Sequence, residues 1–224
     1  MPCSGAHGNQ TFDMDLLDLM MALAGLALAL AFRPWAAAAR EGPPWPWLAW
    51  RVLLPLLWGA DRYVQMPVAQ PLSGACLLML MCGWPMAVLA LVPVAAATAW
   101  FADLSAWEAV HRYVWLGLLP ATLAMGLGAA IRRWLPHHLM VYILGRGFFS
   151  TALAFSAVGA VSALMHVAPV GLQTGDLMLA RWLAGWGDAW LTGMLVAIFV
   201  AFRPQWLATY TDRLYLPVDG PRKP

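Results

Sequence analysis

The stretch "LSGACLLMLMCGWPMAVLALVPVAAATAWF", residues 72–101, decides how many helices the chain contains. It is apolar throughout, so it forms either one helix of about thirty residues or two shorter helices. Gly83 and Pro85 lie near its middle, where glycine weakens a helix and proline removes a backbone donor. The pattern favours a break within "CGWP", residues 82–85.

The composition of the whole chain is that of an integral membrane protein. Of its 224 residues, 62% are hydrophobic and 11% are charged. A soluble domain of this size carries about 25% charged residues. The composition therefore excludes an ordinary soluble protein and leaves no compact soluble domain.

The apolar segments lie at residues 16–32, 47–60, 72–82, 86–101, 114–131, 139–164 and 183–202. In lipid every backbone N–H and C=O must be paired, so such segments form helices unless they close a barrel. Barrel strands alternate apolar and polar residues, and these segments do not. We expect an all-α transmembrane bundle of about seven spans at 16–202, between an N-terminal segment at 1–15 and a basic tail at 203–224.

Basic residues predict the orientation of this bundle. With seven spans and the N-terminus outside, the cytoplasmic residues are Arg33, Arg40, Arg132, Arg133, Arg203, Arg213, Arg222 and Lys223. Only Arg62, Arg112 and Arg181 then fall in outer loops, which matches the positive-inside bias. We therefore expect a multi-pass protein of the bacterial inner membrane, with an extracytoplasmic N-terminal segment and a cytoplasmic tail.

Ionisable side chains inside the apolar segments are the first candidates for function, because a charge in lipid is costly. Arg51 and Arg146 lie near the predicted inner boundary, where each side chain either reaches the headgroups or meets a partner. Gly145 and Gly147 flank Arg146 and leave room for another helix.

Asp188 stands close to the predicted outer start of the last segment, in "GDAWLTGM", residues 187–194. A carboxylate at that place either caps free N–H groups of the helix or contacts a ligand or ion. Thr192 lies one helical turn further on the same face. The pair therefore also fits a polar cavity for a substrate.

The histidines fall on both predicted sides of the membrane. His7, His111 and His166 lie outside, where imidazoles from separate loops, together with Cys3, could converge on a metal ion. Their spacing does not require it, and scattered loop histidines are the alternative.

A second group of histidines and arginines marks the predicted cytoplasmic start of the sixth span. His137 and His138 in "LPHHLMVYILGRGFF", residues 135–149, follow Arg132 and Arg133. Adjacent histidines on a helix point about 100 degrees apart, which disfavours a shared metal. We interpret this group as a headgroup boundary and a docking edge for a cytoplasmic partner.

Motifs for an energy source or an enzyme are missing. The sequence has no GxxxxGK[ST], HExxH, GxSxG or CxxC. We expect no catalytic residues and no cofactor, and a lipid bilayer rather than nucleic acid as the surrounding partner.

The stretches "PLSGACLLMLMCGWPMAVLAL" (residues 71–91) and "DAWLTGMLVAIFVAFRPQWL" (residues 188–207), with the long segment after "LPHHLMVYI", resemble the CbiM-type integral membrane permease family. This family includes the substrate-specific membrane subunits of energy-coupling-factor transporters for cobalt and nickel. The resemblance covers roughly residues 45–210. It implies about seven helices, an extracellular N-terminus, and partners that comprise a separate ATPase and a coupling membrane subunit.

The metal ligands that the resemblance implies do not carry over. Family members bind the metal through an N-terminal Met-His pair and a histidine of a central helix. Here Pro2 stands second and has no amide hydrogen to lose, and no histidine lies near Pro71. Two functions stay open: a permease-like subunit for transition metal uptake, and a non-transporting scaffold or assembly protein that keeps the bundle without the site.

Overall fold

The structure is a computed structural model, and it describes residues 4–32, 46–63, 71–165, 173–210 and 215. All regular elements in these ranges are helices. They are α1 (Ser4–Ala31), α3 (Pro46–Trp58), α4 (Ala60–Tyr63), α5 (Ala75–Cys82), α6 (Trp84–Phe101), α7 (Ala106–Arg112), η1 (Tyr113–Leu118), α8 (Leu119–Trp134), η2 (Val141–Phe149), α9 (Ser150–Met165), α10 (Thr174–Phe202) and η3 (Pro204–Trp206). η1 and η2 are π-helices, and η3 is a 3₁₀ turn.

In the described part of the chain, five helices are long and apolar enough to cross a membrane. Three of them are α1, over the window Met14–Ala31, α6 and α10. The fourth is the continuous helix Ala106–Trp134, which α7, η1 and α8 form together, and the fifth is the continuous helix Val141–Met165, which η2 and α9 form together. Each predicted apolar segment contains one helical stretch, but α3 has 13 residues and α5 only 8. At about 1.5 Å per residue, α5 is about 12 Å long, well short of the roughly 30 Å hydrocarbon core.

The predicted break within residues 82–85 is present. α5 ends at Cys82 and α6 begins at Trp84, with Pro85 in the first turn of α6. Gly83 between them has φ 79° and ψ 158°, a conformation that L side chains rarely adopt. The stretch at 72–101 therefore forms two helices.

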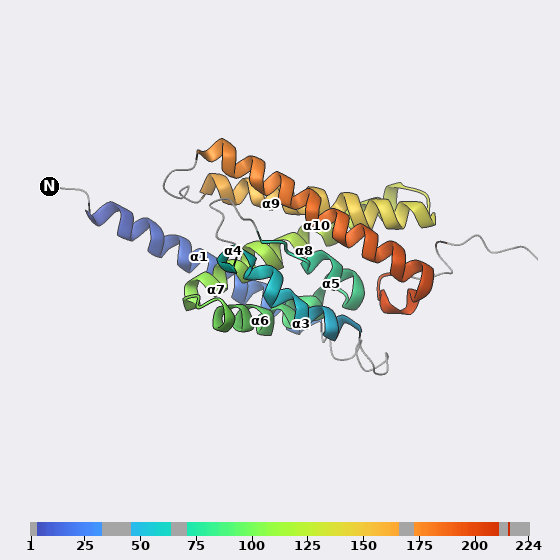
Figure 1. Ribbon diagram of the computed structural model, residues 1–224, viewed down its shortest axis with the longest axis horizontal. Coiled ribbons are helices and arrows are strands. Elements are labelled where there is room, and N and C mark those ends of the chain that lie inside the picture. The colour runs from blue at the N-terminus through green and yellow to red at the C-terminus, as the bar shows by residue number, and fades with distance from the viewer. Residues whose placement is uncertain (1–3, 33–45, 64–70, 166–172, 211–214, 216–224) are drawn as a thin grey trace, which may run out of the picture.

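Successive helical stretches run back and forth along the long axis of the molecule (Figure 1). α1 starts at the left end, α3 returns toward it, and α10 ends at the right end. α9 and α10 lie side by side along most of their length. The start of α1 and the end of α10 therefore lie at opposite ends of the bundle.

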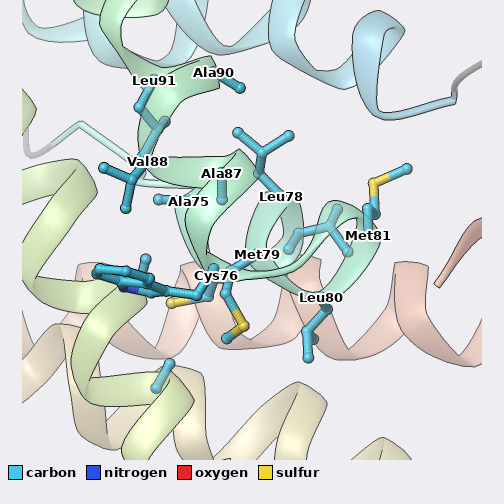
Figure 2. Packing of buried hydrophobic residues seen from close by; sticks show 14 of the residues in the cluster. Ala75, Cys76, Leu78, Met79, Leu80, Met81, Ala87, Val88, Ala90 and Leu91 are labelled. Atoms are coloured by element: carbon cyan, nitrogen blue, oxygen red, sulfur yellow. The ribbon is translucent and has the colours of Figure 1, made fainter. Parts of the chain in front are cut away.

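α5 is the centre of the core. Each of the seven residues from Ala75 to Met81 is at most 3% exposed. Figure 2 shows their side chains projecting from α5 in several directions, toward α6 and other neighbouring helices. By contrast, α1 leaves Met20 62% exposed, as expected of a helix at the lipid-facing edge.

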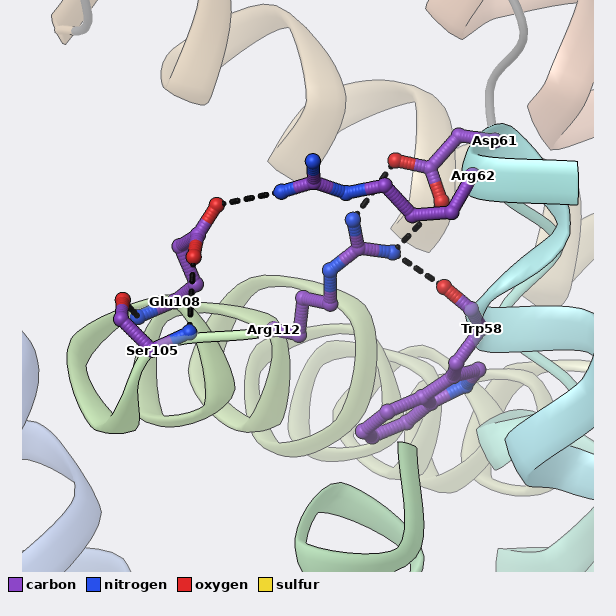
Figure 3. A network of polar contacts seen from close by, with 6 residues as sticks. All are labelled: Trp58, Asp61, Arg62, Ser105, Glu108 and Arg112. Carbon is purple, nitrogen blue, oxygen red and sulfur yellow. Dashed lines mark hydrogen bonds and ion pairs between the residues drawn. The ribbon is translucent and has the colours of Figure 1, made fainter. Parts of the chain in front are cut away.

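A polar network joins α4 and α7 at one end of the bundle (Figure 3). Arg112 contacts both carboxylate oxygens of Asp61, at 2.8 and 2.6 Å, and also donates to the backbone carbonyl of Trp58. Arg62 pairs with Glu108 at 2.6 Å, and Glu108 closes a capping box at the start of α7. Arg62 and Arg112, predicted to lie in loops, thus belong to short helices that they tie together.

Candidate functional site: a buried half-helix with polar groups at both ends

The chain enters α5 through a short non-helical segment, residues 71–74, of which Ser73 and Gly74 are buried. Gly74 has a left-handed backbone, with φ 59°. A Cβ atom at Gly74 would lie 2.5 Å from Leu54 and 2.9 Å from Trp50. Glycine is therefore required here for its conformation and also for space.

Side chains from other helices pair the exposed backbone of this segment. The indole N–H groups of Trp58 and Trp50 donate to the carbonyls of Ser73, at 2.7 Å, and Gly74, at 2.9 Å. The Ser73 hydroxyl accepts from the N–H of Ala75 at 3.1 Å and donates to the carbonyl of Leu116 in η1 at 2.5 Å. Because lipid supplies no partners, these side chains allow α5 to begin inside the bundle.

Asp188 completes this arrangement from α10. Its Oδ1 accepts a hydrogen bond from the N–H of Gly74 at 2.8 Å, and its side chain is fully buried. Its Oδ2 is buried too and has no hydrogen-bond partner among the residues that the structure describes. The carboxylate thus sits at the positive end of the α5 dipole and keeps one oxygen available.

The placement of Asp188 corrects the prediction made from the sequence. Asp188 is not near the start of its own helix, because α10 begins at Thr174 and extends to Phe202. It lies at the midpoint, about 21 Å from either end at 1.5 Å per residue. Arg181, predicted in an outer loop, is also inside α10 and donates to the carbonyl of Gly159 at 2.9 Å. Asp188 therefore caps α5, not α10.

Further polar groups surround Asp188. The Thr192 hydroxyl, one turn along α10, is fully buried and has no hydrogen-bond partner. Two more buried polar side chains belong to neighbouring helices: the Cys76 thiol of α5 donates to the carbonyl of Pro120 at 3.8 Å, and the Thr151 hydroxyl of α9 donates to the carbonyl of Gly147 at 2.8 Å. We name Asp188, Thr192, Cys76 and Thr151 the central polar cluster.

The far end of α5 is held by residues that follow α10. The N–H groups of Ala208 and Thr209 donate to the carbonyls of Met81, at 3.1 Å, and Leu80, at 3.3 Å. The Thr209 hydroxyl also donates to Leu80 at 3.1 Å and meets the Tyr142 hydroxyl at 2.9 Å. Carbonyl groups that a short helix leaves unpaired are therefore satisfied by a distant part of the chain.

Arg146 lies near this same end of α5. Its Nη1 reaches the carbonyl of Thr209 at 3.5 Å, and its guanidinium lies 5.6 Å from the centre of the Tyr142 ring. Its Nε is buried without a hydrogen-bond partner. The flanking Gly147 lies against Val196 of α10, and Gly145 against Ile131 of α8. The fully buried Asp188 and the half-buried Arg146 thus lie near the positive and negative ends of α5.

A small cavity opens beside Arg146, between the end of α8 and the start of η2. Its lining residues are Ile131, Arg132, Leu135, Pro136, His137, Val141, Tyr142, Arg146 and Tyr215. Arg133 and His138 are exposed and are not among them. Of the residues predicted to dock a partner, two therefore line a cavity and two face outward.

Arg51 occupies a separate place in α3. Its guanidinium lies 5.9 Å from the centre of the Trp47 ring, and the residue is only partly buried. It makes no ion pair within the described residues. This geometry is that of a cation resting on an aromatic ring near a helix start.

Of the histidines predicted to lie outside, only His111 has a side chain that the structure describes. His111 Nδ1 contacts the Asp18 carboxylate at 2.7 Å, and the other Asp18 oxygen accepts from the Trp115 indole at 2.8 Å. Cys3 and His166 lie outside the described residues, as does the side chain of His7. Within the described ranges, no group of three His, Cys, Asp or Glu side chains could hold a metal ion.

Sequence reasoning missed the residues that build the ends of α5. Ser73, Gly74, Trp50, Trp58 and Thr209 were not candidates, although "PLSG" before an apolar run is a visible turn signal. Their partners lie tens of residues away in the chain, beyond the reach of a local pattern.

The central polar cluster combines a carboxylate oxygen, a hydroxyl and a thiol in a buried setting. These side chains can accept a hydrogen bond or provide some of the ligands of a small cation. No protein-family model, no curated protein and no solved structure matches the chain.

Proposed function

We propose that the chain is a permease-like membrane subunit that carries a small cation past the start of α5. The observation that supports this proposal most directly is the unpaired Oδ2 of Asp188, which is buried one helical turn from the unpaired hydroxyl of Thr192. Each such buried group costs about 1–3 kcal/mol when it lacks a partner. A bound cation would offset that cost.

The broken-helix geometry supports this proposal. Membrane transporters commonly bind their cargo near the bilayer midplane, where a helix is interrupted and its backbone ends face the site. Here α5 begins inside the bundle, and Asp188 is at the midpoint of α10. Both observations support a site for a carried ion near the midplane of the proposed membrane.

The resemblance to the CbiM-type family suggests the cargo, namely a transition metal ion such as cobalt or nickel. The ligands implied by the family are absent, so the central polar cluster would take their place. Carboxylate, hydroxyl and thiol suit a borderline metal better than an alkali ion. Because no nucleotide-binding motif occurs in the chain, a separate ATPase and a coupling membrane subunit would supply the energy.

The proposed membrane topology is seven passes in a bacterial inner membrane, with the N-terminus outside and the C-terminus in the cytoplasm. The alternating helix directions support an odd number of passes (Figure 1). In this topology α5 is a short pass that begins within the bundle.

Metal binding by the purified full chain tests the proposal. We expect equilibrium dialysis with Co²⁺ or Ni²⁺ to give one bound ion per chain. Asp188→Asn should weaken that binding by about tenfold or more, since one charge-assisted contact is worth about 1.5–3 kcal/mol. Asparagine still accepts from Gly74, so the fold should persist.

Asp176→Asn is the matched control. Asp176 is an exposed carboxylate in the first turn of the same helix, and its loss should leave metal binding unchanged. If the wild-type chain binds neither ion and deletion leaves cellular cobalt and nickel unchanged, the transport proposal is wrong.

The second candidate function is a membrane scaffold or assembly protein without transport. The hydrogen bond from Gly74 to Asp188 favours it, because a carboxylate that caps α5 has a structural role without any ligand. Under this alternative, Asp188→Asn would change neither metal content nor growth on limiting metal.

A further inference from the structure

We propose that a phosphate group, either in the headgroup of an anionic phospholipid or as free phosphate, binds at the open mouth of the cavity beside Arg146, whose interior has room for about one water molecule. Three cationic or protonatable side chains, those of Arg132, His137 and Arg146, line it from two helices and the turn between them. No acidic residue is among its lining residues. The cavity therefore lacks a countercharge in the described part of the chain.

The unpaired donors of Arg146 are the main evidence for this site. Its guanidinium has five N–H donors, yet among the described residues it makes only one hydrogen bond, a long one of 3.5 Å from Nη1 to the carbonyl of Thr209. The Nε atom is buried and has no partner in the described ranges, and Arg146 forms no ion pair with a residue of those ranges. An arginine in such a setting is costly unless an anion joins it.

Neighbouring residues leave room for this guanidinium. A Cβ atom at Gly128 would lie 3.0 Å from Arg146 Nε, so glycine at 128 makes space for it. Tyr142 lies beneath the charge, and Tyr142 and Tyr215 pack with ring centres 4.9 Å apart. The rings provide a rigid apolar floor, and the arginine fork matches two phosphate oxygens.

The position of the cavity suits a lipid headgroup. It lies where α8 ends and η2 begins, and Trp134 beside it is 78% exposed, as an interfacial anchor would be. Basic pockets between transmembrane helices at this depth accommodate anionic headgroups. This placement does not depend on the central polar cluster or its cargo.

Native mass spectrometry of the purified full chain tests the site. We expect one molecule of phosphatidylglycerol to remain bound at concentrations at which phosphatidylcholine does not. Arg146→Gln should weaken this binding by about tenfold or more, and Arg132→Gln should weaken it less, because Arg132 is exposed. Arg146→Lys should fall between wild type and Arg146→Gln, since it keeps the charge and loses the fork.

Arg133→Gln is the matched control, because Arg133 is adjacent to Arg132 but does not line the cavity. It should bind phosphatidylglycerol like the wild type.

A separate experiment measures the thermal stabilisation of the chain by inorganic phosphate. Stabilisation that Arg146→Gln abolishes identifies free phosphate as a ligand, while lipid binding without it identifies the headgroup.

Two outcomes overturn the proposal. The first is that the wild-type chain retains phosphatidylglycerol no better than phosphatidylcholine and is not stabilised by phosphate. The second is that Arg133→Gln weakens binding as much as Arg146→Gln, which would mean a general surface attraction. The unfolding temperatures of Arg146→Gln and Arg146→Lys are measured in parallel. They show whether a loss of phosphatidylglycerol binding arises from misfolding.

Discussion

The two carboxylate oxygens of Asp188 have different roles, and substitutions can distinguish these roles. Asp188→Ala removes the acceptor for the Gly74 N–H and should lower the free energy of unfolding by about 1–3 kcal/mol. Asp188→Asn keeps an acceptor and should lower it less. Thermal unfolding in detergent, followed by the circular dichroism of the helices, measures both. Equal losses in the two variants would contradict the capping role.

The two arginine pairs at the end of the bundle should differ in strength. Arg112→Gln leaves the partly buried Asp61 and the Trp58 carbonyl without their donor, and should lower the free energy of unfolding by about 2 kcal/mol. Arg62→Gln breaks an exposed pair and should lower it by less than about 1 kcal/mol. Parallel thermal unfolding of both variants checks the order, and a reversed order would refute it.

At the scale of elements, Gly83 separates α5 from α6. Gly83→Ala should lower the free energy of unfolding by about 1–3 kcal/mol, because alanine rarely adopts φ 79°. No atom lies within 4 Å of the added Cβ, so the loss would reflect conformation and not a clash. Unfolding temperatures of the purified variants provide the measurement.

Gly126→Ala is the control for that prediction. Gly126 is helical and also has open space around its Cβ position. Alanine there should stabilise α8 slightly, by up to about 1 kcal/mol. If Gly83→Ala behaves like Gly126→Ala, the break does not depend on the backbone of glycine 83.

Local patterns predicted the elements better than their contacts. The break near Gly83 follows from glycine and proline chemistry, which acts on neighbouring residues only. The apolar pattern predicts a last segment that starts at residue 183, whereas α10 begins at Thr174, because Asp176 and Arg181 lower the apolar character of a stretch that is nevertheless helical. The partner of Asp188 lies 114 residues away, at Gly74, so spacing along the chain carries no signal for it.

At the scale of the whole molecule, the helix directions predict which segments share a membrane side. α8 and α10 end at the same end of the bundle, while the turn between α6 and α7 lies at the other (Figure 1). Reporters fused after Arg133 and after Phe202 should both be cytoplasmic, and a reporter after Asp103 periplasmic. A periplasmic signal after Arg133 would overturn the seven-pass proposal.

The way α5 is held also bears on how the protein is made. Its first turn depends on Asp188, 114 residues later, and its last carbonyls on Thr209, whose hydroxyl contacts Leu80 across 129 residues. α5 therefore leaves the ribosome long before the groups that pair its ends exist. Both ends of α5 can be paired only after α10 and the residues that follow it have been synthesised.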